Sequence, residues 1–361
     1  MIRNLLRVDL LLLLPATLLS SVGLLMIYSI SFDSDPSIFV RQLLYVLFSI
    51  MFFVIASRID FKTILHLYPL FYISLIAFLI LTFIIGVETR GSTRWIDLGF
   101  VSLQASELAK PILVLSLAFV LTKYPPINLK SFFLSTALVA VPTVLVFSQP
   151  DLGNSFILGI LWIFMVFIAG VNLFYLGGLA ASLLVIAPFF WQLLKDYQKA
   201  RVLTFLNPGL DPQGASYNIV QALIALGSGQ IIGRGLGRGP QSHLNFLPEE
   251  RTDFIFAFIG EELGFIGVSL IILLAAFLIW RLLRIATSAK SKEACLFTFG
   301  AAFILMFQFF VNVGMNMGIL PVTGVTLPFV SFGGSSVFAM FVLLGLVGAA
   351  EREKEKEPKE V

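Results

Sequence analysis

Long apolar stretches, separated by short polar segments, dominate the pattern of this chain. Continuous apolar runs differ from the alternating strands of an outer-membrane barrel, and a helix needs about 20 apolar residues to cross a bilayer. The pattern therefore predicts an all-α polytopic membrane protein with about ten transmembrane helices. The stretches cover about residues 10–30, 42–57, 64–86, 105–122, 131–148, 152–170, 173–194, 253–282, 294–313 and 332–350.

Composition and charge agree with a membrane protein. Hydrophobic residues make up 58% of the 361 and charged residues only 12%, whereas a soluble domain has roughly 45–50% and 25%. Most Lys and Arg outside the longest loop fall on the side of the N-terminus, which predicts that both termini are cytoplasmic. We expect one domain over 1–350 and a charged, solvated cytoplasmic tail over 351–361. The net charge of +3 gives no sign of a nucleic-acid partner.

The longest loop, about residues 195–252, follows the seventh predicted helix and lies outside the cytoplasm. Its glycine-rich run, 227–237, resembles a phosphate-binding loop, but no strand pattern precedes it. Two interpretations stay open. The run is a re-entrant segment packed closely on its neighbours, or its backbone N–H groups approach a lipid diphosphate together with Arg234 and Arg238.

Ionisable residues at membrane depth are candidates for function. Glu107 and Lys110 are three residues apart and so lie on one helix face. They form either a structural ion pair or part of a substrate site, and both interpretations imply a polar interior on that face.

The eighth predicted helix begins near Asp253, at the outer boundary of the membrane. Asp253 either caps this helix or acts as a base on a lipid-linked substrate. Gly260 and Gly264 form a Gly-xxx-Gly step that lets another segment approach closely, and Glu261 and Glu262 lie deeper. Asp151, at another outer boundary, is expected to be a helix cap rather than a catalytic group.

Two outer segments complete the candidates. Arg94 and Trp95 place a cation beside an aromatic ring. Trp95 is either an interfacial anchor or a platform for a sugar ring, with Arg94 on a phosphate. The uncharged run 321–336, rich in Gly, Pro and Ser, is expected to re-enter the membrane as a structured loop that lines a cavity.

Taken together, these residues resemble the SEDS family (shape, elongation, division and sporulation). Its motifs follow in family order over nearly the whole chain. Those matched are Gly91–Ile96, Ser106-Glu107 with Lys110, Gln149–Gly153, Arg201 with Phe205–Pro208, Asp211–Gly214, Leu247–Glu249 with Thr252–Ala257, Gly260–Gly264, Gly318–Gly324, Leu327–Ser331 and Gly333–Ser336.

Within the family, Gln241–Phe246 resembles the elongation branch (RodA) more than the division branch (FtsW). Three places depart from the family pattern: Ala105 stands where Pro is common, Glu250-Arg251 where Arg-His is common, and Phe332 where Tyr is common. The second departure argues against a histidine beside the catalytic aspartate and places a permanent cation there.

The resemblance implies a peptidoglycan glycosyltransferase that polymerises lipid II at the outer face of the bacterial cytoplasmic membrane, for cell elongation and rod shape. It also implies a class B penicillin-binding protein as partner. The family's catalytic aspartate is here Asp253, which would take the proton of the acceptor 4-hydroxyl in one inverting displacement. No cofactor is certain, although a divalent cation such as Mg or Mn could assist. The alternatives are a lipid II flippase and a structural scaffold.

The remaining candidate residues are assigned by role. Those expected to bind substrate are Trp95, Arg94, Lys110, Arg201, Arg251 and Ser331. Those expected to shape the cavity are Glu107, Asp151, Glu261, Gly333 and Gly334. No residue is assigned to a metal, because one Cys and two His cannot build a zinc site of the usual kind.

Overall fold

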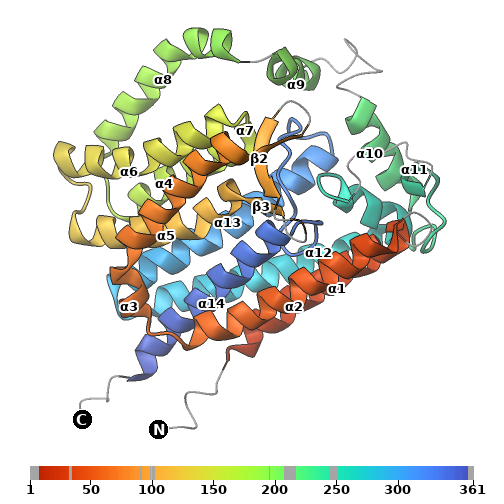
Figure 1. The fold of residues 1–361 in the computed structure, drawn as a ribbon, viewed down its shortest axis with the longest axis horizontal. Coiled ribbons are helices and arrows are strands. Elements are labelled where there is room, and N and C mark those ends of the chain that lie inside the picture. The colour runs from red at the N-terminus through yellow and green to blue at the C-terminus, as the bar shows by residue number, and fades with distance from the viewer. Residues whose placement is uncertain are drawn as a thin grey trace.

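A computed structural model describes residues 8–31, 35–89, 92–97, 99, 102–194, 196–206, 217–243 and 251–356. Each predicted apolar stretch forms a helix, and within these ranges eight helices are long and apolar enough to cross a membrane. This confirms the polytopic helical fold (Figure 1). The helices that match the stretches are α1 Leu10–Ser31, α2 Pro36–Arg58, α4 Tyr68–Ile85, α5 Ala105–Lys123, α6 Leu129–Ser148, α7 Leu152–Ile168, α8 Leu173–Leu193, α12 Ile255–Ser288, α13 Lys292–Asn316 and α14 Gly334–Lys356.

Shorter helices lie between these. α3 (Phe61–His66) precedes α4, because Pro69 at the start of α4 favours a new helix over a continuous one. The long outer loop contains α9 Asp196–Leu206, α10 Tyr217–Ser228 and α11 Pro240–His243. In Figure 1, α8 extends away from the other helices toward α9, while α10 and α11 lie on the opposite side.

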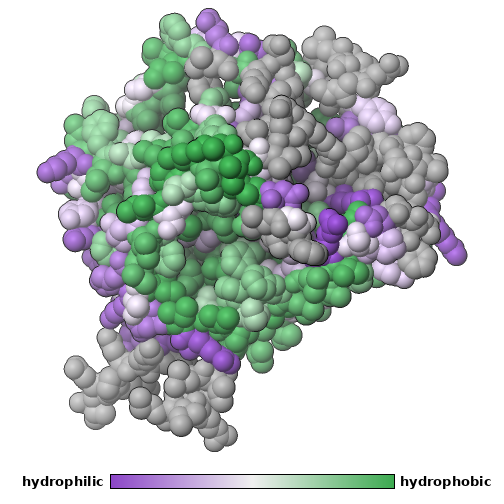
Figure 2. All heavy atoms as spheres, in the orientation of Figure 1, coloured by the Kyte–Doolittle hydropathy of each residue, from purple (hydrophilic) through white to green (hydrophobic). Residues whose placement is uncertain are grey.

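The centre of the bundle is formed by α5, α13 and α14, whose residues are mostly buried. By contrast, α4, α6 and α8 expose many apolar side chains. Figure 2 shows a broad apolar surface with polar residues gathered toward its lower left and its right. Such a surface is stable against lipid, and it explains why over half of the chain is hydrophobic although only part of it is core.

A small antiparallel sheet lies between α4 and α5 and was not expected from the sequence. Its strands are β1 Val87–Thr89, β2 Ser92–Asp97 and β3 Ser102–Gln104, in the order β1-β2-β3. Trp95 on β2 lies opposite Gln104 on β3. Strands this short carry too little alternation to be recognised in a sequence dominated by helices.

The glycines of α12 allow a close approach, as the sequence predicted, although the segment that approaches includes irregular backbone. α12 is kinked at Gly264, where φ is +64° and ψ is −160°. A side chain at Gly264 would meet the backbone of Ile231 and Gly233, and one at Gly260 would meet Leu226 of α10. The glycine-rich run therefore packs directly on the kink.

The first turn of α1 and the last turns of α14 lie at the same end of the bundle (Figure 1). Arg281 of α12 joins them, because its guanidinium is 2.8 Å from both Asp9 and Glu351. The assignment of 351–361 to a cytoplasmic tail stays a prediction, although its first residues belong to a helix. α14 continues to Lys356, and these contacts fix residues that the sequence assigned to the tail.

Candidate active site at the start of α12

The backbone that carries Asp253 is held at three consecutive carbonyls. The carbonyl oxygen of Arg251 accepts from the N–H of Phe332 at 2.8 Å. The carbonyl of Thr252 accepts from the Ser331 hydroxyl at 2.6 Å. The carbonyl of Asp253 accepts from two amide side chains of α13. These contacts fix the main chain of Asp253, while the residue itself is partly exposed.

Asp253 does not occupy the N-cap position of α12, which was one of the two roles expected for it. The N-cap of α12 is Phe254, which has no capping hydrogen bond from its side chain. Three residues on, the N–H of Ala257 donates instead to Oδ1 of Asn316 at 3.0 Å. The cap of α12 is therefore supplied by a neighbouring helix.

The segment between α13 and α14 is irregular and packed inside the bundle, as expected. Val325, Leu327, Phe329 and Val330 are at most 2% exposed. Ser331 was expected to bind substrate, but its hydroxyl is buried and also accepts from the N–H of Leu327 at 2.8 Å. This arrangement favours a supporting role for Ser331.

The glycines that follow make close contacts with α2. The N–H of Gly333 donates to Oε1 of Gln42 at 3.2 Å. A side chain at Gly334 would meet the ring of Tyr45. Both glycines were assigned to the cavity lining, and the structure places them where the loop meets the second helix.

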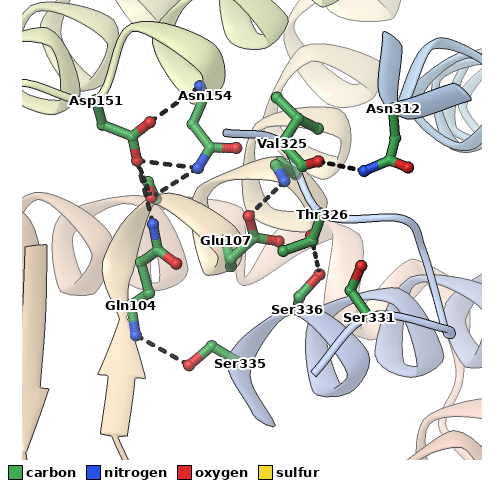
Figure 3. A network of polar contacts seen from close by, with 12 residues as sticks. Gln104, Glu107, Asp151, Asn154, Asn312, Val325, Thr326, Ser331, Ser335 and Ser336 are labelled. Carbon is green, nitrogen blue, oxygen red and sulfur yellow. Dashed lines mark hydrogen bonds and ion pairs between the residues drawn. The ribbon is translucent and has the colours of Figure 1, made fainter. Parts of the chain in front are cut away.

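A second polar centre surrounds Asp151 (Figure 3). Asp151 is the N-cap of α7 and accepts from the N–H of Asn154 at 3.2 Å, which confirms the predicted cap. Its other oxygen accepts from the side chains of Gln104 at 3.1 Å, Ser106 at 3.0 Å and Asn154 at 3.0 Å. Only 3% of Asp151 is exposed. With this many donors, the hydrogen-bonding capacity of the buried carboxyl group is largely used, and Asp151 ties the starts of α5 and α7 together.

Glu107 and Lys110 form a buried ion pair, with Lys110 Nζ 2.7 Å from Glu107 Oε1. Lys110 is 0% exposed and Glu107 is 2% exposed. Glu107 points toward the loop residues Val325 and Thr326 in Figure 3. This geometry favours the structural interpretation of the pair over a contact between Lys110 and substrate.

Hydrogen bonds connect the two centres through the buried loop (Figure 3). Asn312 donates to the carbonyl of Asp253 at 3.1 Å and to that of Val325 at 2.8 Å. The next loop residue, Thr326, bonds the Ser336 hydroxyl at 2.8 Å. The neighbouring Ser335 hydroxyl then accepts from the N–H of Gln104 at 2.9 Å, and Gln104 contacts Asp151. The loop therefore links the start of α7 to the backbone of Asp253.

The outer residues Arg94 and Trp95 lie on β2. The guanidinium of Arg94 donates to the main-chain carbonyls of Gln149 and Pro150. It thus holds the turn before α7, rather than standing ready for a phosphate as one interpretation expected. Trp95 is half-buried, and both interpretations of its ring remain open.

Arg251, two residues before Asp253, is partly exposed. Its charge acts on Asp35, the N-cap of α2. The pKa of Asp35 is lowered chiefly by hydrogen bonds from Ser37, with smaller contributions from the charges of Arg41 and Arg251. Arg251 therefore lies within electrostatic reach of the outer end of α2.

The deeper glutamates use the backbone donors of the glycine-rich run. Glu262 Oε1 accepts from the N–H of Gly237 at 2.7 Å and from the Ser29 hydroxyl at 2.8 Å, while Glu261 Oε1 accepts from the N–H of Gln241 at 2.9 Å. The N–H groups of Arg234 and Gly235 donate to main-chain carbonyls of these glutamates. The idea that this backbone cradles a diphosphate is therefore wrong for these amides, and the re-entrant packing interpretation is supported.

Some predicted residues lie outside the described part. Arg201 lies on α9, but its side chain is not described, and the segments 207–216 and 244–250, which contain Asp211–Gly214 and Leu247–Glu249, are not described either. Among described residues, no three His, Cys, Asp or Glu side chains gather as a metal site would require.

Sequence reasoning missed two supporting residues of the site. Asn312 and Asn316 lie on α13 and are both 0% exposed. Their four-residue spacing inside an apolar helix places two amides on one face, and that signal could have identified them.

Comparison with known proteins shows clear relatives. A family model described as cell cycle protein, for FtsW, RodA and SpoVE, matches residues 9–356. Peptidoglycan glycosyltransferase MrdB of Escherichia coli K12 is 39% identical over 295 residues, 81% of this chain and 80% of that protein. Among solved structures, a chain of a peptidoglycan synthase complex that coordinates polymerisation and crosslinking superposes with a TM-score of 0.85 at 29% identity, covering 98% of this chain and 100% of that one. Rod shape determining protein RodA of Thermus thermophilus superposes at 0.74 with 26% identity, covering 98% and 99%.

Proposed function

Because this chain belongs to the cell cycle protein family of FtsW, RodA and SpoVE, we propose that it polymerises lipid II into β-1,4 glycan with Asp253 as general base. It is a peptidoglycan glycosyltransferase and a multi-pass protein of the bacterial cytoplasmic membrane. Its similarity to MrdB and to a rod shape determining protein supports a role in cell elongation.

One observation carries the assignment of the base. Asp253 is a partly exposed residue on a backbone held by four hydrogen bonds. The neighbouring acidic groups Glu107 and Asp151 are buried and bonded inside the bundle. A general base must reach the proton that it abstracts, and Asp253 combines a fixed position with access.

The chemistry needs only one carboxylate. A glycosidase uses two, one to protonate the departing oxygen and one to attack or to activate water. Here the leaving group is a diphosphate, which departs as an anion without a proton. Asp253 takes the proton of the acceptor 4-hydroxyl, whose oxygen forms the new bond to the anomeric carbon as the bond to the diphosphate breaks. One displacement turns an α-linked donor into a β-1,4 product.

The departing diphosphate requires positive charge nearby. Arg251 is the described candidate, because it lies two residues before Asp253 and is partly exposed. Arg201 on α9 is the second. Arg94 and Lys110 are already engaged within the protein, so we give them supporting roles. Trp95 remains our candidate for stacking on a sugar ring.

We assign residues 1–350 to a single membrane domain and propose a class B penicillin-binding protein as its partner. The similar chain from a peptidoglycan synthase complex supports a partner of this kind, because polymerisation and crosslinking are coordinated in that complex.

The test is a gel assay of the purified protein, with its partner, on lipid II. Asp253→Asn keeps the shape of the side chain but removes the base, and we expect the rate to fall about 10²–10⁴-fold. Asp60→Asn is the matched control. It also removes one carboxylate, at the N-cap of α3, where Asn caps as well as Asp, and its rate should stay unchanged. Glycan formation by Asp253→Asn at the control rate would refute the base assignment.

A second assay distinguishes the alternative function, a lipid II flippase, from the polymerase. Translocation of labelled lipid II is measured in liposomes with the same variants. Translocation by the unaltered protein without any glycan formation would support the flippase and contradict the polymerase.

A further inference from the structure

We propose that Asn316 is a positioning residue for glycosyl transfer: it caps α12 from outside that helix, fixes the Asp253 carbonyl and keeps the Ala257 N–H from binding the Asp253 carboxylate. The proposal rests on the proposed function of Asp253 as base.

Asn316 is the last residue of α13 and is fully buried. Its Oδ1 accepts from the N–H of Ala257 at 3.0 Å. Its Nδ2 donates to the carbonyl oxygens of Asp253 at 3.0 Å and Asn312 at 2.8 Å. One side chain therefore contacts both the residue before the cap of α12 and the third residue of its first turn.

The first N–H groups of a helix have no partner within that helix. A side-chain oxygen at the N-cap normally accepts from the second or third residue. The N-cap of α12 is Phe254, which has no such oxygen. Asn316 supplies the missing acceptor from a different helix, so the capping function and the N-cap position are separated.

The cap from Asn316 affects the carboxylate of Asp253, the residue just before the N-cap. Acidic groups are stabilised at helix N-termini by the unpaired N–H groups and by the helix dipole. Were the Ala257 N–H open, the carboxylate of Asp253, four residues earlier on the N-terminal side, could compete for it, and a carboxylate bound in that way is a weaker base. Asn316 occupies that N–H and also fixes the Asp253 carbonyl.

Two substitutions of Asn316 should act in opposite directions. Asn316→Ala opens the Ala257 N–H to the Asp253 carboxylate and favours its ionised form. We expect kcat to fall about 10- to 100-fold, with KM for lipid II changed less than threefold and the acid limb of the pH–rate profile moved to lower pH. Asn316→Asp retains an acceptor but adds a like charge near Asp253, which disfavours ionisation. Its acid limb should move to higher pH.

The matched control is Asn128→Ala. Asn128 is the N-cap of α6, and its Oδ1 accepts from the N–H of Ser131, three residues on, at 2.9 Å. The same substitution therefore removes a cap hydrogen bond of the same kind far along the chain from α12. We expect a lower melting temperature but an unchanged rate and pH profile.

The experiment measures rate against pH for both Asn316 variants, Asn128→Ala and Asp253→Asn, each with the partner, after size-exclusion chromatography has selected folded protein. Opposite movements of the acid limb support the proposal. If Asp253→Asn is inactive while Asn316→Ala keeps the control's rate and profile, the positioning role is overturned and the base assignment stands. If Asp253→Asn is active, both are overturned. If Asn316→Ala yields no folded protein, the pH–rate profile of Asn316→Asp is the test. An acid limb at the same pH as in the unaltered protein overturns the proposal.

Discussion

Lys110 Nζ lies 2.7 Å from Glu107 Oε1, inside the bundle and out of contact with the surface. Burying two charges is costly, and the pair is tolerated only because each charge compensates the other. Glu107 also has a second oxygen, Oε2, with no partner among the described residues. The pair therefore makes α5 sensitive to the loss of either member.

The first prediction concerns this pair. Glu107→Gln leaves an uncompensated buried ammonium, and Lys110→Met leaves an uncompensated carboxylate, so each should destabilise the fold by about 3–5 kcal/mol. The double variant removes both charges and should be more stable than the worse single variant. Thermal unfolding in detergent measures all three.

Lys62→Met is the matched control, because Lys62 pairs with Glu353 at 3.0 Å but is 61% exposed. We expect a loss below about 1 kcal/mol there. Equal losses at the buried and the exposed pair would contradict our account of the buried one.

The second prediction contrasts two aspartates. Asp151→Asn replaces an acceptor oxygen by an NH₂ group where Gln104, Ser106 and Asn154 all donate. Leaving buried donors without an acceptor costs about 1–3 kcal/mol, so the melting temperature should fall. Asp253→Asn should lower the polymerisation rate about 10²–10⁴-fold and lower the melting temperature less than Asp151→Asn does, because Asp253 is partly exposed whereas Asp151 is only 3% exposed.

Melting temperature and glycan synthesis are measured side by side for both variants. A stable, inactive Asp151→Asn protein would place Asp151 among the reacting groups and contradict its structural role.

The third prediction concerns the kink of α12. Gly264 has φ +64°, and a Cβ there would meet backbone atoms of Ile231 and Gly233, which cannot move as a flexible side chain can. Gly264→Ala should therefore cost about 1–3 kcal/mol and loosen the glycine-rich run.

Gly227→Ala is its control, since Gly227 lies in α10 with open space around the position of a Cβ. Alanine in a helix is favoured over glycine by roughly 1 kcal/mol, so this variant should be as stable as the parent or more so. Hydrogen exchange of residues 229–238 reports the local effect. Unchanged exchange in Gly264→Ala would show that the run does not depend on the kink.

The sequence identified the parts of this fold that depend on long patterns. Apolar runs of about 20 residues predict helices because the bilayer demands them, and the matching helices formed. Asp151 was predicted as a cap from its position alone. The pairing of Glu107 with Lys110 followed from their spacing on one helix face.

What the sequence did not indicate depends on contacts between distant segments. Asn316 caps a helix that begins 61 positions earlier in the chain, and local capping rules do not reach so far. Arg94 appeared suited to phosphate, yet main-chain carbonyls near α7 bind it. The amides near Gly237 appeared free for an anion, but Glu262 of the following helix provides that anion.

The hydrogen bonds that hold residues 251–253 bear on which side chains this segment can carry. The hydrogen bonds described there end on main-chain oxygens, and every amino acid carries that atom. These hydrogen bonds therefore do not depend on which side chains the segment carries. A substitution at Arg251 therefore leaves these main-chain acceptors in place, and the backbone of Asp253, two residues further on, keeps its position.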